Sequence, residues 1–178
     1  MWRADPFSDP KPLIRSVYAY VAYRLGDGPE AEDVTSETFA RALRYRESFD
    51  ARKGEPIGWL IGIARRCIAD AALSRRSYQE LDDATEPAAP GDVEADTIRR
   101  LELRQAVAAL DETGRELVAL RFGADLSARQ IAELTGKSTH AVEVALSRTL
   151  ERLRKSLETP EKTELRPVRF LSPRRYPG

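Results

Sequence analysis

Cysteine and histidine are almost missing from this chain of 178 residues, which has only Cys67 and His140. One thiol cannot form an intramolecular disulfide, and no thiolate cluster for zinc is possible. No apolar run approaches the ~18 residues of a membrane-spanning helix, and the start of the chain lacks the apolar core of a signal peptide. These absences predict a cytoplasmic protein with no metal site and no membrane insertion.

An excess of charge of either sign is also absent, because 29 basic residues balance 29 acidic ones. No global field therefore draws the chain to nucleic acid. The charge is nevertheless unevenly distributed: residues 77–98 carry seven acidic side chains and no lysine or arginine, whereas the parts before and after them are mildly basic. The chain therefore consists of two mildly basic parts joined by an acidic connector.

The residue groupings of most enzymes are missing as well. The sequence offers no nucleophile–base pair, no phosphate-binding loop and no cluster of metal ligands. We therefore expect neither catalysis nor a cofactor.

Apolar spacing with a period near four predicts an all-α protein. In the first half, the pattern predicts a helix over Pro12–Leu25 and a second helix from Pro29 to about Arg46. A loop from Phe49 to Pro56 and a long helix over Pro56–Arg76 should follow. One side of the second helix is expected to carry Val34, Thr38, Ala42 and Tyr45, with Phe39 and Leu43 alongside. The helical pattern returns at Ile98, with Leu101, Val107, Leu110, Leu117, Val118 and Phe122 as its apolar positions.

Composition divides the chain into two small helical domains. Residues 77–98 combine many acids with few large apolar side chains, which predicts a flexible linker. The expected boundaries are a first domain over 1–76, the acidic linker over 77–98, a second domain over 99–157 and a Pro/Arg-rich tail over 158–178.

The second domain contains the strongest local signal, LSARQIAELTGKSTHAVEVALSRTLERLR. Ser127 and Gln130 form a capping-box pattern, and Ala132 is small where two helices would cross. Gly136 suits a left-handed turn, and Val142 suits the space between the helices. This spacing predicts a helix-turn-helix, whereas an ordinary helical hairpin is the weaker alternative.

The second helix of this motif should begin near Ser138 or Thr139. Its expected core positions are Val142, Leu146, Leu150 and Leu153. The opposite face would meet a DNA major groove, with arginines and Lys137 near phosphates. The candidate DNA-binding residues are Lys137, Ser138, Thr139, His140, Glu143, Val144, Ser147 and Arg148. For His140 the alternative is a histidine that is exposed at the helix start and does not contact DNA.

Two passages of the first domain resemble region 2 of the sigma-70 family. AEDVTSETFARAL (31–43) is similar to the family's polymerase-binding helix, and ESFDARKGEPIGWLIGIARRCIAD (47–70) is similar to its −10 segment. The helix-turn-helix resembles region 4, which reads the −35 element. Regions 1.1 and 3 of the larger members have no counterpart here, so the chain resembles a sigma factor of the extracytoplasmic-function (ECF) type.

The resemblance implies which residues act. Docking on the β′ clamp helices of core RNA polymerase would use Asp33, Ser36, Glu37 and Arg41, although the acids equally suit a helix N-terminus. Capture of the −10 strand would use Arg52, Lys53, Trp59, Arg65 and Arg66, with core packing as the alternative for Trp59. Further implied partners are the polymerase β flap, promoter DNA and an anti-sigma factor.

The resemblance also leaves rivals and departures. His140–Leu150 differs from the common family pattern, because Glu143 and Ala145 replace basic positions and Val144 replaces a small polar one. A stand-alone helix-turn-helix regulator is the main alternative, and a helical adaptor that binds only proteins is the second.

Overall fold

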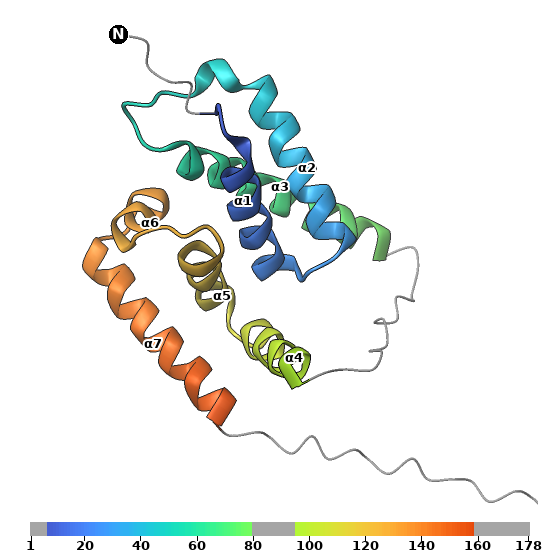
Figure 1. Ribbon diagram of the computed structural model, residues 1–178, viewed down its shortest axis with the longest axis vertical. Coiled ribbons are helices and arrows are strands. Elements are labelled where there is room, and N and C mark those ends of the chain that lie inside the picture. Colours follow the sequence, from blue (N-terminus) through green and yellow to red (C-terminus); the bar gives the residue numbers. More distant parts are fainter. Residues whose placement is uncertain (1–6, 80–94, 159–178) are drawn as a thin grey trace, which may run out of the picture.

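The computed structural model describes residues 7–79 and 95–158 as helices joined by short turns, with no strand in those two ranges (Figure 1). The all-α prediction is therefore confirmed. The elements are α1 (Pro10–Leu25), α2 (Pro29–Arg44), the 3-10 turn η1 (Arg46–Ser48), α3 (Pro56–Gln79), α4 (Ala95–Ala108), α5 (Glu112–Val118), the π-helix η2 (Ala119–Gly123), α6 (Ala128–Thr135) and α7 (Thr139–Glu158). Within the described part of the chain, no helix is both long and apolar enough to cross a bilayer.

The starts of the first two helices follow from local chemistry. The Asp9 side chain accepts a hydrogen bond from the Lys11 backbone nitrogen at 3.3 Å, so α1 begins two residues before the predicted Pro12. Pro29 opens α2, as predicted, because its fixed φ and missing N–H suit the first helical position.

The first domain is built from α1, α2 and α3 around a hydrophobic core. Val17, Val21, Leu60 and Ile61 are fully buried there. Thr38 is buried as well, and its hydroxyl donates to the Val34 carbonyl at 2.7 Å, which satisfies the polar group inside the core.

The helices extend further into the predicted linker than expected. α3 continues to Gln79 and α4 already begins at Ala95, so both ends of the predicted 77–98 segment are helical. Residues 80–94 of the linker and the tail from residue 159 lie outside the described residues.

The predicted cap, turn and helix crossing of the helix-turn-helix are confirmed. Ser127 and Gln130 form a reciprocal capping box at the start of α6, and Gly136 ends that helix with a left-handed φ of 68°. Ala132 and Val142 are buried between α6 and α7, and α7 begins at Thr139.

Removing the Ser127 hydroxyl should destabilise the protein by about 1 kcal/mol, because the N-cap bond to Gln130 would be lost. Urea unfolding of Ser127→Ala against wild type measures this loss. Ser156→Ala, at an exposed serine within α7, serves as the control and should change the free energy of unfolding by less than about 0.5 kcal/mol. Equal effects of the two changes would contradict a capping role.

One predicted core position, Leu150, is wrong, and three further apolar positions of the predicted pattern are exposed. In α7, Leu150 is 40% exposed whereas Thr149 is 3% exposed, because a 3.6-residue period alternates steps of four and three. Leu43 and Tyr45 at the end of α2, and Phe122 in η2, are also exposed large side chains.

The two domains share one core, which the sequence analysis did not predict. The main cluster of buried residues joins Tyr20 and Leu60 of the first domain to Leu120, Leu126 and Ile131 of the second. Figure 1 shows α5 and α6 lying close to α1 and α3. A smaller cluster, built mainly by α4, α5 and α7, completes the second domain.

Candidate nucleic-acid interface

The outer face of α7 is open to solvent along its first half. His140, Glu143, Ser147 and Arg148 are exposed, whereas Val144 is half-buried. Burial of Val142 and Leu146 on the opposite side fixes this orientation. The structure thus presents these residues on one side of a rigid helix, as a major-groove reader requires.

At the start of α7, Ser138 has a structural role. The Ser138 hydroxyl accepts a hydrogen bond from the Ala141 backbone nitrogen at 3.1 Å, so Ser138 caps α7. Lys137 and Thr139 beside it are exposed. Among these three candidates, Lys137 and Thr139 keep their side chains available to DNA.

The loop between η1 and α3 holds one predicted arginine in an internal pair. The Arg52 guanidinium donates two bonds of 3.0 Å to the Asp50 carboxylate, and these bonds raise the pKa of Arg52. Its side chain is 82% exposed, so exchange of Asp50 for a phosphate needs no unfolding. Lys53 next to it is exposed.

Trp59 lies in an aromatic cluster. Its ring centroid is 5.8 Å from that of Phe7 and 5.5 Å from that of Phe49, and Phe7 and Phe49 are 5.2 Å apart. Trp59 is half-buried. The ring therefore anchors the loop to α3, and a stacking role for it stays a prediction.

Arg65 and Arg66 are adjacent in α3 but have different surroundings. Arg65 turns to the second domain, where its Nε lies 3.1 Å from Glu116 Oε1 and its Nη1 lies 3.5 Å from the Leu134 carbonyl oxygen. Arg66 is exposed. The structure thus does not gather the five predicted −10 residues into one surface.

A separate acidic face lies on α2. Asp33, Ser36 and Glu37 are exposed. Arg41 lies beside them but pairs with Glu37 at 2.6 Å and with Asp70 of α3 at 2.7 Å, and these hydrogen bonds raise its pKa. Arg41 is held by Asp70 and by Glu37, so Glu37 is already in an ion pair. Asp33, Ser36 and Glu37 form the exposed part of this surface, which we call the α2 face.

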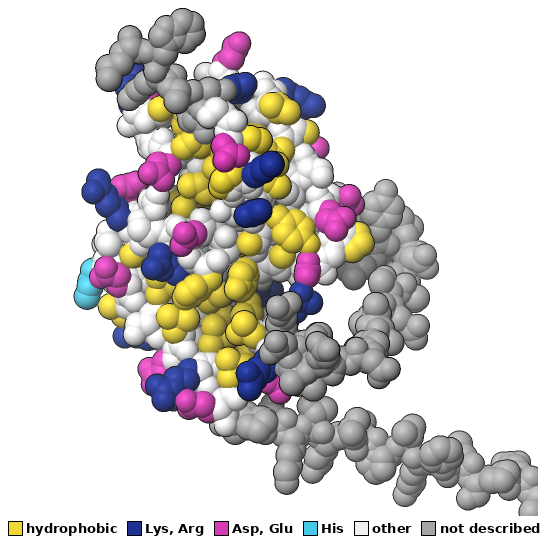
Figure 2. Space-filling model, in the orientation of Figure 1, with side chains coloured by type: hydrophobic (Ala, Val, Ile, Leu, Met, Phe, Trp, Pro, Cys, Tyr) yellow, Lys and Arg dark blue, Asp and Glu magenta, His cyan; other side chains and the backbone are white. Residues whose placement is uncertain are grey.

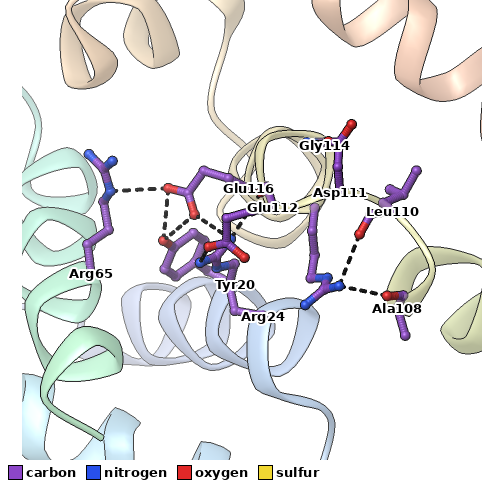
Figure 3. A network of polar contacts seen from close by, with 10 residues as sticks. Tyr20, Arg24, Arg65, Ala108, Leu110, Asp111, Glu112, Gly114 and Glu116 are labelled. Atoms are coloured by element: carbon purple, nitrogen blue, oxygen red, sulfur yellow. Dashed lines mark hydrogen bonds and ion pairs between the residues drawn. The ribbon is translucent and has the colours of Figure 1, made fainter. Parts of the chain in front are cut away.

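A polar cluster between the domains was missed by the sequence analysis. It consists of Tyr20, Arg24, Arg65, Glu112 and Glu116, which we call the interdomain cluster (Figure 3). Burial raises the pKa of the Tyr20 phenol, and the charge of Glu116 adds to that effect. Tyr20 and Glu116 are 96 positions apart in the sequence, so no local sequence pattern predicts their hydrogen bond.

Charges of both signs alternate on the surface. On the face in Figure 2, lysines and arginines are interspersed with acidic side chains, and no broad basic patch appears. Counterion release from a basic patch is the main source of sequence-independent DNA affinity, so this face alone favours weak binding. Within the described ranges, no group of histidine, cysteine and acidic residues could hold a metal ion.

Comparison with protein families places two matches on the two domains. The model for Sigma-70 region 2 matches residues 11–78, and the model for Sigma-70, region 4 matches residues 100–153. The matches cover the α1–α3 domain and the helix-turn-helix domain in the expected order.

Individual relatives agree with these matches. The chain is 35% identical over 159 residues to the ECF RNA polymerase sigma factor BldN of Streptomyces coelicolor, which covers 86% of this chain and 58% of BldN. It is 30% identical over 144 residues to RNA polymerase sigma factor SigV of Bacillus subtilis, covering 80% of this chain and 82% of SigV. Sigma factor RpoE of Bartonella quintana, solved with the anti-sigma factor NepR, has the same fold, with a TM-score of 0.66 at 20% identity over 85% of this chain and 96% of that chain.

Proposed function

Because the chain belongs to the ECF family of RNA polymerase sigma factors, we propose that it binds core RNA polymerase and directs initiation at promoters defined by −10 and −35 elements. The observation that carries the proposal is the pairing of a capped helix-turn-helix with a region 2 domain on one chain. A regulator that acts alone needs only the first of these.

Recognition of the −35 element is assigned to α7. His140, Glu143, Ser147 and Arg148 face solvent on a helix whose start is fixed by Ser138. An arginine reads guanine through two hydrogen bonds, and a carboxylate accepts from the cytosine amino group. Arg148 and Glu143 are therefore the proposed base readers, with Lys137 as a phosphate contact.

Capture of the −10 strand is assigned to the loop before α3 and to the exposed side of that helix. Arg52 and Lys53 are exposed at the loop, and Trp59 holds the loop in place through Phe7 and Phe49. Basic side chains beside an aromatic platform suit single-stranded DNA. Arg66 would extend this surface along α3.

Attachment to core polymerase is assigned to the α2 face, with the β′ clamp helices as its partner and the β flap as the partner of the second domain. Asp33 and Glu37 lie one turn apart and are exposed, so arginines of a partner can pair with both. The chain itself performs no catalysis and acts in the cytoplasm. An anti-sigma factor is the expected regulator, as NepR is for the Bartonella protein.

Fluorescence anisotropy with a labelled promoter fragment tests this function against the stand-alone regulator. The proposal predicts that the free chain binds the duplex weakly and that core polymerase brings specific binding. Tight binding by the free chain, unchanged by core polymerase, would favour the regulator. A lack of DNA binding in both mixtures would favour the adaptor.

Arg148→Ala should weaken promoter binding of the chain–core complex by about 1–3 kcal/mol, because a bidentate contact to a base would be lost. The control is Lys155→Ala in the last turn of α7, where an exposed lysine pairs with Glu151. Affinities of both variants for the same fragment, measured at two salt concentrations, give the comparison. A mere halving of affinity, removed by salt, would identify Arg148 as a phosphate contact instead.

A further inference from the structure

A side chain from outside the region 2 match packs against the loop between η1 and α3 (residues 49–55), which we call the −10 loop. Phe7 lies before α1, whereas the region 2 model matches residues 11–78. The Phe7 ring centroid is 5.2 Å from that of Phe49, where the loop begins, and 5.8 Å from that of Trp59, in the first turn of α3. One ring therefore contacts side chains from both ends of the loop.

The three rings contact one another edge-on or at a tilt. Their planes meet at 74° for Phe7 and Phe49, at 63° for Phe7 and Trp59, and at 57° for Phe49 and Trp59. Aromatic side chains prefer such arrangements over a face-to-face stack. All three side chains are half-buried. Phe7 thus supplies two of the three ring contacts that join the ends of the −10 loop.

The middle of the −10 loop has only exposed side chains, from residue 51 to residue 55. The backbone nitrogens of Lys53 and Arg52 donate to the carbonyl and the carboxylate of Asp50 at 2.9 Å and 3.0 Å, which are bonds within the loop itself. Gln130 donates to the Glu55 carboxylate at 3.0 Å, also at an exposed position. Because exposed hydrogen bonds contribute little beyond what water offers, the half-buried rings are the main constraint on the direction of the loop relative to α3.

Phe7 also contacts a cation beside the loop. The guanidinium carbon of Arg46, in η1, is 5.6 Å from the centroid of the Phe7 ring, which is within the range of a cation–π contact. Arg46 is exposed and precedes the −10 loop in the chain. Its charge adds to those of Arg52 and Lys53, and such a series of basic side chains suits the backbone of a single strand.

Resting on the proposed function, we propose that Phe7 is a positioning residue for −10 capture, which holds the −10 loop in the direction in which Arg52 and Lys53 meet the single strand. A loop that is already ordered loses less conformational entropy when it binds a ligand than a loop that must first be ordered. Phe7 itself need not touch DNA for this effect. The segment before α1 is thereby part of promoter reading in this chain, although it lies outside the region 2 match.

Transcription by the chain–core complex from two forms of one promoter tests this proposal. The promoter is one that run-off transcription of source-genome fragments identifies with the wild-type chain. Phe7→Ala removes two aromatic pairs and should lower the transcript from the fully paired template about tenfold. A template whose −10 element is already opened by mismatches should restore most of the transcript, because strand capture then no longer has to offset melting.

Two further variants separate the ring contacts from other effects. Ser8→Ala changes the exposed neighbour in the same segment and should stay within about twofold of wild type on both templates. Phe7→Tyr keeps the ring and should stay within about threefold on the paired template. Should Phe7→Ala fail to fold, Phe7→Leu removes the ring but keeps most of the apolar volume, and the same two templates apply.

Trp59 fluorescence reports the ring contact directly. In a Trp2→Phe background Trp59 is the only tryptophan of the chain. Phe7→Ala should then shift its emission to longer wavelength and increase its quenching by acrylamide, whereas Ser8→Ala should leave both unchanged. Circular dichroism of the same samples shows whether the helices are retained.

The results that would overturn the proposal are distinct from a failure of the proposed function. Equal losses from the paired and the opened template would identify a general structural defect. A full transcript of Phe7→Ala from the paired template, or unchanged Trp59 fluorescence, would show that the loop does not depend on Phe7. These results leave the proposed function intact. A wild-type chain that yields no transcript from any template would remove the proposed function and this inference with it.

Discussion

Asp33→Lys combined with Glu37→Lys is expected to abolish binding to core polymerase. Both side chains are exposed on the α2 face, and the change replaces two attractions to a basic partner by two repulsions. Loss of one close interfacial charge pair costs about 2–5 kcal/mol, which is a factor of about 30 to several thousand in Kd. Titration of labelled core polymerase with each variant measures the loss.

The control variant has the same change of net charge at positions away from the α2 face. Glu102→Lys combined with Glu158→Lys alters exposed positions of α4 and α7 and should leave core binding within about twofold. Circular dichroism should show that both variants remain folded, since Asp33 and Glu37 are exposed and the Glu37–Arg41 pair is a surface i,i+4 pair, which contributes only about 0.3–0.5 kcal/mol. Equal binding by the two double variants would show that polymerase does not use the α2 face.

Leu120→Ala is expected to destabilise the whole protein by about 2–5 kcal/mol. The Leu120 side chain is fully buried in the core that both domains share, and truncation leaves a cavity between them. Urea unfolding should show the loss as one shifted transition for both domains. Leu150→Ala, at a leucine that is 40% exposed, is the matched control and should cost less than about 1 kcal/mol.

A small effect of Leu120→Ala would contradict the shared core. So would two separate unfolding transitions in the wild-type protein, because domains that share buried side chains unfold together. These outcomes would leave the helix-turn-helix itself untouched, since its capping box and its left-handed turn are set by Ser127, Gln130 and Gly136.

Local features of the fold were predictable because local chemistry determines them. The Ser127–Gln130 capping box and the left-handed Gly136 are each decided within a few residues, and both are present as expected. The position of Thr149 in the core shows the limit of this reasoning. A strict four-residue step selected Leu150, but the true period of the helix turned Thr149 inward.

Contacts between the domains were beyond local reasoning. Tyr20 and Glu116 are 96 positions apart in the sequence and meet only when both domains are folded. Ion pairs within the chain also engage two of the candidate site residues. Arg65 pairs with Glu116, and Arg41 pairs with Glu37 and Asp70. A sequence shows that a charge is present but not which partner occupies it.

Run-off transcription with purified core polymerase, with and without this chain, tests the sigma-factor proposal most directly. Fragments of the source genome should serve as templates, so that no promoter sequence has to be assumed. The account predicts discrete transcripts that require the chain and that disappear with Asp33→Lys/Glu37→Lys. A complete lack of chain-dependent transcripts from every template would contradict it.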